Sequence, residues 1–185
     1  KANKGSSGID GIGIEDIENV GVEKYLKEIQ TELVQGAYHP SPVKRVMIPK
    51  PDGSQRPLGI PTVRDRIVQM ATKIAIEPVF EADFKDCSYG FRPKRSAKQA
   101  LEVVRKACNN KGYYVVDADI EKFFDNVNQD KLMRLVEQRI SDRRILKLIR
   151  QWLKVGVLYG NMLEISELGT SQGSVISPLL ANIYL

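Results

Sequence analysis

Two aspartates behind an apolar stretch are the side chains with the clearest chemical potential. In YYVVDADIEKFFDN, residues 113–126, Asp117 and Asp119 follow the apolar residues 113–116. Such a run predicts a buried strand over 113–120, and alternation along it places both aspartates on one face. Mg²⁺ takes hard oxygen ligands together with substrate phosphates, so phosphoryl chemistry at a metal is one reading. Aspartates that only cap the following turn would give the same pattern, and a charged side chain at a core edge needs a cation or donors in either case.

Two cations flank a predicted hairpin turn. Residues 51–54, Pro-Asp-Gly-Ser, separate two short alternating segments within residues 43–61, which is typical of a β-hairpin. Lys50 and Arg56 stand on either side of this turn. They could converge on one phosphate chain, the arginine as a planar fork and the lysine as a point charge. Lysines also protect exposed hairpin edges, so this pair alone does not decide the function.

Two loops add candidate nucleic-acid contacts. Residues 170–174, TSQGS, combine exposed amides with Gln172, while Gly173 lets a backbone or base approach closely. Residues 88–99, SYGFRPKRSAKQ, interleave rings for bases with cations for phosphates. The rings and cations of this second loop are Tyr89, Phe91, Arg92, Lys94 and Arg95. A plain loop before a helix and core-facing rings are the alternative interpretations.

Composition places the chain among globular proteins with a basic surface. It has 185 residues, 42% hydrophobic and 28% charged, and a net charge of +5. Residues 44–111 hold 15 Lys or Arg against 7 Asp or Glu, which favours a polyanion partner, although a solvated lysine-rich face is the alternative. Without an apolar run of about 20 residues or a signal-peptide core, we expect a cytoplasmic protein without membrane contact. Cys87 and Cys108 lack metal-ligand spacing, and His39 in a proline-flanked loop is not expected to act as a general base.

Capping boxes open two of the helices that must hold these residues. Thr62 and Asp65 predict a helix start before Ile67, Met70, Ala71 and Ile74, with an interruption expected at Pro78. Ser96 and Gln99 predict another before Leu101, Val104 and Cys108. We expect both helices to face the core.

The remaining patterns alternate irregularly between helix and strand. A helix over residues 22–35 is expected to end at Gly36, and a hairpin to turn at residues 160–161. Ser177 and Pro178 favour a last helix start, as cap and first-turn proline. Further helical patterns are carried by Leu132, Leu135 and Val136, and by Ile145, Leu148, Ile149 and Trp152. These elements predict an α+β architecture.

Taken in order, the motifs resemble the reverse transcriptase domain of group II intron-encoded proteins, the maturases. The matching pieces are GSSGIDG, RVMIPKPDGSQRPLGIPTVRDRIVQ, SYGFRPKRSAKQAL, DADIEKFFDNV and QGSVISPLLANIYL, which span nearly the whole chain. The resemblance implies a right-hand polymerase fold. Residues 1–110 would form the fingers, and residues 111–185 the first part of the palm.

The resemblance also implies roles for individual residues. Asp119, helped by the carbonyl of Ile120, would hold Mg²⁺ in a two-metal site, with Asp117 as a neighbour. Phe124 would be the steric gate that favours deoxynucleotides. Nucleotide contacts would come from Lys50, Arg56, Lys122, Phe123, Phe124, Gln172 and Gly173. Template contacts would come from Gly8, Asp10, Gly11, Arg64, Arg92, Lys94 and Arg95. The family's usual PQGG reads Ser-Gln-Gly-Ser at 171–174, which keeps the glutamine.

The implied reaction is RNA-directed DNA synthesis by two-metal phosphoryl transfer. The implied partners are group II intron RNA, whose splicing the protein would assist, an RNA template with a DNA primer, and deoxynucleoside triphosphates. The family's paired aspartates would come after position 185. We therefore expect a fragment that binds RNA, does not polymerise alone and self-associates through exposed fingers surface.

Three rival interpretations remain. A glycosyltransferase would use Asp117 and Asp119 to hold a metal on a nucleotide sugar, but it leaves the hairpin cations and the Gln172 loop unexplained. A splicing factor that lost its chemistry would keep the RNA-binding surface. Related reverse transcriptases of retrons or diversity-generating elements would share the mechanism, although SYGFRP and SPLLANIYL look more like the group II type.

Overall fold

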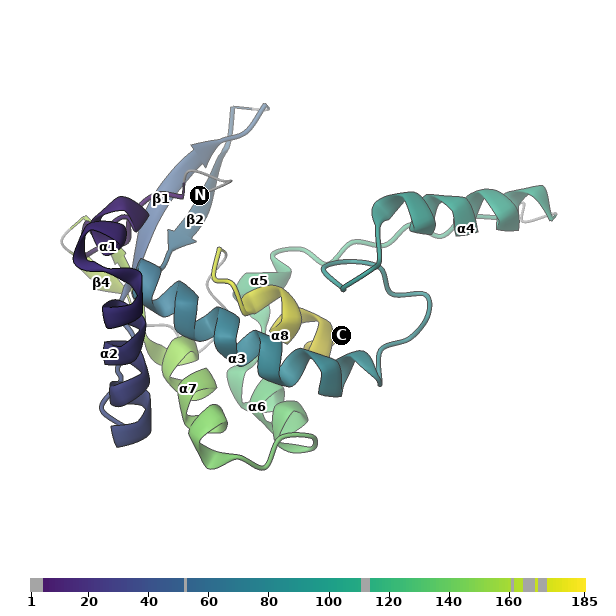
Figure 1. Ribbon diagram of the computed structural model, residues 1–185. Coiled ribbons are helices and arrows are strands. Elements are labelled where there is room, and N and C mark those ends of the chain that lie inside the picture. The colour runs from purple at the N-terminus through teal and green to yellow at the C-terminus, as the bar shows by residue number, and fades with distance from the viewer. Residues whose placement is uncertain (1–4, 52, 111–113, 161, 165–168, 170–172) are drawn as a thin grey trace.

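The structure is a computed structural model that describes residues 5–51, 53–110, 114–160, 162–164, 169 and 173–185. Eight helices and four strands are assigned within these residues (Figure 1). The helices are α1 (Ile14–Val20), α2 (Val22–Gln35), α3 (Val63–Glu81), α4 (Ala97–Asn109), α5 (Phe123–Asn126), α6 (Gln129–Glu137), α7 (Arg143–Lys154) and α8 (Ser177–Tyr184). The strands are β1 (Val43–Pro49), β2 (Gln55–Ile60), β3 (Val157–Tyr159) and β4 (Met162–Glu164). The predicted α+β class is confirmed.

The four strands form one sheet in the order β2-β1-β3-β4. Both predicted hairpins are present, since β1 and β2 pair antiparallel and so do β3 and β4. A parallel pairing of Val43 with Val157 joins the hairpins. Arg45 on β1 also donates to Glu164 on β4 across 2.6 Å. The β1–β2 hairpin extends beyond the helices, so its tip is exposed on both faces (Figure 1).

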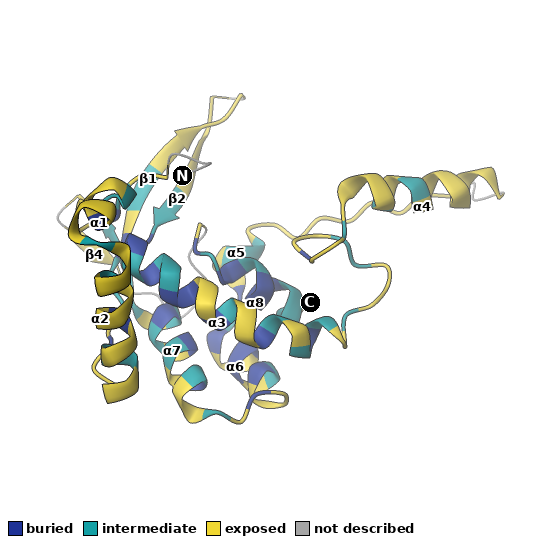
Figure 2. Cartoon of the chain, viewed as in Figure 1, coloured by how far each residue is buried: buried dark blue, intermediate teal, exposed yellow. Residues whose placement is uncertain are grey.

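The hydrophobic core lies between α3, α6, α7 and α8. Leu132 of α6, Ile149 of α7 and Leu180 of α8 are almost completely buried within it, and Ile29 of α2 belongs to the same cluster. Figure 2 shows buried residues on these packed helices. On α6 and α7 most of the predicted apolar positions face the core, and Val136, Ile149 and Trp152 are buried. Leu135 is the exception, since it is only partly buried and lies outside the core cluster. We call this group of packed helices the helical body.

A polar network ties α3 to the rest of the helical body. Asp65 is 2% exposed, and its carboxylate accepts hydrogen bonds from the Tyr38 hydroxyl at 2.6 Å, the Thr62 hydroxyl at 2.7 Å and the Ser41 amide at 3.1 Å. The Tyr38 hydroxyl accepts in turn from Trp152 Nε1 at 3.2 Å. Burial raises the pKa of Tyr38 well above its usual value, and the bond to Asp65 raises it further. A buried carboxylate is thus satisfied by three donors.

Helix α3 begins as predicted but buries a different face. Thr62 caps it by accepting from the Asp65 amide at 3.1 Å, which confirms the capping box. The buried positions include Val68, Thr72, Ile76 and Phe80, whereas Met70 and Ile74 of the predicted face are 45% and 66% exposed. The two stripes compete because this helix is apolar on more than one side. The expected interruption at Pro78 is also wrong, since the helix continues to Glu81.

Helix α4 does not face the core. Ser96 caps it by accepting from the Gln99 amide, as expected, but none of its residues is buried. Leu101 and Val104 are 69% and 56% exposed, and Figure 1 shows the helix standing apart from the helical body. Helix α8 differs slightly from expectation too, because Ile176 is its cap residue and Ser177 its first helical residue. Among the described residues, no helix is both long and apolar enough to cross a bilayer.

Candidate active site

The segment that carries the two aspartates lies in solvent. Residues 114–120 have no regular secondary structure, so the predicted buried strand is wrong for the described part of this segment. Tyr114 and Val116 are 97% and 93% exposed. A strand forms only when its backbone pairs with a neighbouring strand, and none of the described strands pairs with this segment. Asp117 and Asp119 are therefore hydrated, and no burial cost has to be offset.

The oxygen atoms at this position fit part of a magnesium site. The Asp119 carboxylate is exposed, and the carbonyl of Ile120 follows it directly in the chain. Carboxylate and carbonyl oxygens are hard ligands of the kind that Mg²⁺ takes, in combination with substrate phosphates. No group of three or more acidic, cysteine or histidine side chains that could hold an ion is found among the described residues. Asp119 and Ile120 could therefore supply only part of the ligand set that Mg²⁺ needs.

A tight turn connects Ile120 to the short helix α5. Lys122 has φ 49° and ψ 42°, the left-handed conformation that is uncommon for residues other than glycine. The turn directs Phe123 toward the core, where its ring lies 6.1 Å from that of Tyr184. The rings of Phe123 and Phe124 meet edge to face at 5.7 Å. Contact with the helical body through Phe123 therefore fixes the position of Phe124.

The two hairpin cations lie near the tip of the β1–β2 hairpin. Arg56 of β2 is paired with Ile48 of β1, and Lys50 follows the last residue of β1 directly. The turn is closed by the Lys50 amide, which donates to the Ser54 carbonyl at 2.8 Å. Both cations are exposed at the tip.

Close backbone packing brings the end of the glutamine loop to this hairpin. Gly173 has φ 108°, and a Cβ built there would lie 2.3 Å from the carbonyl oxygen of Gly59 on β2. At Gly169 a Cβ would lie 2.9 Å from the carbonyl oxygen of Phe124, and its amide donates to Val127 at 2.7 Å. The chain thus passes α5 at residue 169 and β2 at residue 173. Gln172, the predicted nucleotide contact, lies outside the described residues.

The amino-terminal loop packs on the start of α3. Gly8 is buried, and a Cβ there would lie 2.6 Å from the Thr62 Cα. Arg66 donates to the Ser6 carbonyl at 2.5 Å and holds the loop in place. The Asp10 carboxylate accepts from the Ile12 amide at 3.1 Å and shapes the turn at Gly11, whose φ is 71°. Asp10 and Gly11 are exposed, whereas Gly8 is a packing residue.

Two predicted template contacts form bonds within the protein instead. Arg92 is 7% exposed, and its guanidinium donates to both carboxylate oxygens of Glu81 and to the carbonyls of Lys85 and Ser88, at distances of 2.6 to 3.1 Å. Arg64 is paired with Glu32 of α2. Because these donors are used internally, both side chains organise the fold in this arrangement. The sequence does not reveal these internal bonds, because nothing in a single sequence distinguishes a buried arginine from an exposed one.

The other two cations of the basic loop are more accessible. Lys94 is exposed and has φ 60°. Arg95 lies over the Tyr89 ring, 5.4 Å from its centroid, and pairs with Asp86 at 2.9 Å. The Asn182 side chain of α8 donates to the Gly90 carbonyl at 2.9 Å and ties the loop to the helical body.

Two buried glutamines that were not predicted from the sequence hold the chain beside the candidate site. The Gln69 side chain accepts from the Val175 amide at 2.9 Å, just behind Gly173. Gln129 donates to the carbonyls of Leu153 and Gly169 at 2.9 and 3.0 Å. Each anchors the chain on one side of residues 170–172. No signal in a single sequence marks a buried glutamine.

Comparison with known proteins identifies the family and the fold. The profile of the family described as "Reverse transcriptase (RNA-dependent DNA polymerase)" matches residues 48–185. Protein YkfC of Escherichia coli is 42% identical over 183 residues, which cover 96% of this chain and 48% of YkfC. Group II intron-encoded protein LtrA of Lactococcus lactis is 39% identical over 185 residues, 100% of this chain and 30% of LtrA. A chain of a partial Cas6-RT-Cas1–Cas2 complex superposes on 87% of this chain, with TM-score 0.57, 27% identity and 28% of its own length covered.

The chain belongs to the reverse transcriptase family of RNA-dependent DNA polymerases. Its resemblance to group II intron-encoded proteins is confirmed, and so is the expected polymerase fold. The chain spans about half or less of the length of these curated relatives.

Proposed function

We propose that this chain supplies the fingers, residues 1–110, and the first part of the palm, residues 111–185, of an RNA-directed DNA polymerase encoded by a group II intron. The observation that carries this proposal is the meeting of β2, α5 and the glycines of the glutamine loop. Gly173 packs on the strand that holds Arg56, while Gly169 packs on the helix that holds Phe124. These contacts support a site in which Arg56 would grip the triphosphate and Phe124 would face the sugar.

The reaction would be attack of the primer 3′-hydroxyl oxygen on the α-phosphorus of a deoxynucleotide, with release of pyrophosphate. Lys50 and Arg56 would bind the outer phosphates, and backbone amides at Lys122 and Phe123 would add donors. Mg²⁺ bound by Asp119 and the Ile120 carbonyl would supply positive charge to the phosphates. Phe124 would close the space that a ribose 2′-hydroxyl needs. Gln172 and Gly173 would line the incoming nucleotide.

The RNA template would follow the basic loop and the amino-terminal loop. Lys94 and Arg95 would contact its phosphates, and the exposed Asp10 and Gly11 would lie along its backbone. Arg92 would act by fixing the basic loop. The intron's own RNA would be both template and splicing substrate. Polymerisation would use this chain together with the paired aspartates expected beyond residue 185.

The direct test is primer extension on an RNA template by the full-length protein, with Mg²⁺ and deoxynucleotides. We expect Asp119→Asn to lower the extension rate at least about a hundredfold, because a metal contributes several kcal/mol of charge stabilisation. Asp117→Asn is the matched control, since it removes the same charge from the same exposed segment. It should retain activity within about threefold, as expected for a surface change that touches no reactant.

Two outcomes would overturn the proposal. Equal loss in both variants would mean that Asp119 has no special part in the reaction. Absence of synthesis by the wild type, with tight and salt-sensitive RNA binding retained, would indicate an RNA-binding splicing factor without polymerase chemistry.

A further inference from the structure

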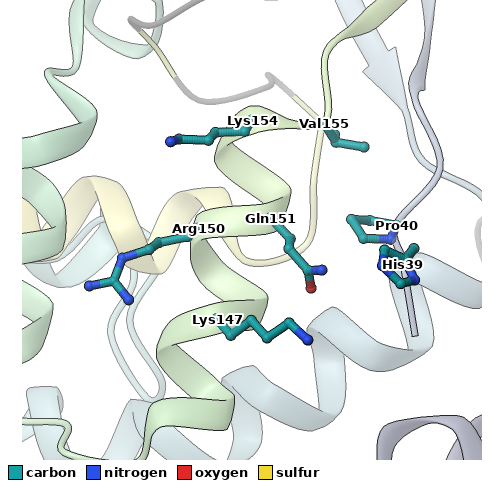
Figure 3. A pocket seen from close by; sticks show the side chains of 7 residues that line it. All are labelled: His39, Pro40, Lys147, Arg150, Gln151, Lys154 and Val155. Carbon is teal, nitrogen blue, oxygen red and sulfur yellow. The ribbon is translucent and has the colours of Figure 1, made fainter. Parts of the chain in front are cut away.

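A pocket lies beside α7, built from residues that have no part in the candidate active site. It has a volume of about 390 Å³, within the range of small-ligand sites. Its walls come from the loop after α2 and from the last turns of α7 (Figure 3). The lining residues are His39, Pro40, Lys147, Arg150, Gln151, Lys154 and Val155.

One wall of the pocket holds a polar atom without a partner. The side-chain oxygen of Gln151 is buried, and no described group donates a hydrogen bond to it. Figure 3 shows this amide between α7 and the His39–Pro40 loop. A buried acceptor that has lost water is costly unless a donor reaches it. Gln151 lines the pocket, so rotation of its side chain would turn the oxygen toward a ligand N–H that could satisfy it.

The rest of the lining is largely apolar and includes two rings. The His39 ring is held in place by a hydrogen bond from its Nδ1 to the Ala37 carbonyl at 2.8 Å. The ring nitrogen is the donor, since a carbonyl oxygen only accepts. The His39 ring, the Pro40 ring and the Val155 side chain border the same space. Such surfaces suit the face of a planar base, which gains stacking contact without a specific edge.

The rim of the pocket carries positive charge. Helix α7 has five exposed cations and no acidic residue, namely Arg143, Arg144, Lys147, Arg150 and Lys154. Arg144 and Arg150 are paired with Asp142 and Glu137. Lys154 has no ion pair within the described part of the chain, and Lys147 has only a long hydrogen bond of 3.4 Å to the Gly36 carbonyl. Two rim lysines are therefore available to an anion.

We propose that this pocket binds a single unpaired nucleotide of a folded RNA. The base would lie against His39 and Pro40 and donate an N–H to the Gln151 oxygen, while Lys147 and Lys154 contact the flanking phosphates. Unstacked bases in RNA loops and bulges are the parts that proteins recognise by stacking and edge contacts. The choice of RNA rests on the proposed function, while the nucleotide chemistry rests on the pocket itself.

The test is fluorescence anisotropy of labelled RNA bound to the full-length protein. The two probes are a hairpin with one bulged adenosine and the same hairpin fully paired. We expect the wild type to bind the bulged hairpin at least about threefold more tightly, as one hydrogen bond with stacking allows. Gln151→Leu should remove this difference and leave binding of the paired hairpin unchanged. His39→Ala, at an exposed position, should reduce the difference as well, which keeps the test open if the first variant fails to fold.

Two charge variants on the same helix distinguish RNA binding in the pocket from general electrostatic attraction of RNA to α7. Lys154→Gln and Arg143→Gln each remove one positive charge from α7, but only Lys154 lines the pocket. Lys154→Gln should weaken binding of the bulged hairpin at least about threefold more than Arg143→Gln does. Equal effects of the two, or no preference of the wild type for the bulge, would overturn the proposal. Because this readout needs no DNA synthesis, failure of primer extension leaves it standing and failure here leaves the polymerase proposal standing.

Discussion

The helical body and the arm differ in whether their apolar residues are buried. We define the arm as α4 and residues 114–120. Both contain apolar residues at regular spacing. In the helical body these residues are covered, with Leu132 and Ile149 completely buried. In the arm they are in water, with Leu101 and Val116 at 69% and 93% exposure. Asp119, the expected metal ligand, belongs to the arm.

This difference separates a packed part of the described chain, which supplies stability, from an exposed part that holds Asp119, the expected metal ligand. The helical body holds its shape through packing and through the Asp65 network. The arm has apolar surface that is free to contact another surface. Substitutions in the helical body should therefore change stability, whereas substitutions in the arm should change association with other surfaces.

Removing a core side chain should destabilise the protein far more than removing an arm side chain. Ile149→Ala should lower the free energy of unfolding by about 2–5 kcal/mol, because it leaves a cavity in a packed core. Leu101→Ala, the matched change on α4, should alter it by less than about 0.5 kcal/mol. Urea unfolding followed by fluorescence of Trp152, the only tryptophan, measures both. Similar losses would mean that α4 is packed in solution.

The buried polar network should contribute the next largest effect. Tyr38→Phe removes a donor to Asp65 and the acceptor of the Trp152 ring, which leaves buried polar atoms unsatisfied. We expect a loss of about 1–3 kcal/mol in the free energy of unfolding. Tyr159→Phe removes an exposed hydroxyl and serves as control, with a change below about 0.5 kcal/mol. Equal values would show that the network adds no stability.

The exposed arm should mediate weak self-association. Sedimentation velocity of this chain should give a sedimentation coefficient that rises with concentration. Leu101→Lys should shift the onset to at least about tenfold higher concentration, because it removes one apolar side chain from each contact. Leu163→Lys, at an exposed leucine of β4, should leave the onset unchanged. A wild type that sediments identically at all concentrations would refute this expectation.

The smallest effect concerns pH and the start of α7. The bond from the Arg144 guanidinium, then the Arg144 amide, lowers the pKa of Asp142 from 3.8 to about 2. A carboxyl whose pKa is lower in the folded state contributes stability above its unfolded pKa, and loses it as protonation proceeds. Wild type should thus exceed Asp142→Asn in stability above pH 4, and the difference should shrink between pH 4 and pH 2. Acid titration of the urea midpoint measures this, and a constant difference would contradict it.

Local signals in the sequence predicted the elements whose formation depends on nearby residues. The caps at Thr62 and Ser96, the end of α2 at Gly36 and both hairpins are present. Each depends on hydrogen bonds or backbone freedom within a few residues. The order of the motifs then led to the polymerase family.

Features that depend on distant partners were not predictable in this way. The buried face of α3 includes Thr72, and polar residues do not signal burial in a hydrophobic pattern. The run before Asp117 has strand character, but strand formation requires a partner backbone. Arg92 looked like a template contact because a sequence does not show that Glu81 lies opposite it. The spacing of apolar residues predicts that one face of a helix or strand is apolar. Whether another part of the protein covers that face depends on the whole fold.

The contact between Gly173 and Gly59 sets a tight mechanical tolerance. Two backbones touch there without a side chain between them, so neither segment can shift toward the other. A swing of the β1–β2 hairpin toward residue 173 would push that residue ahead of it. Alanine at position 173 would force the two backbones apart, and it would shift the hairpin relative to residue 173 before it altered any reacting group.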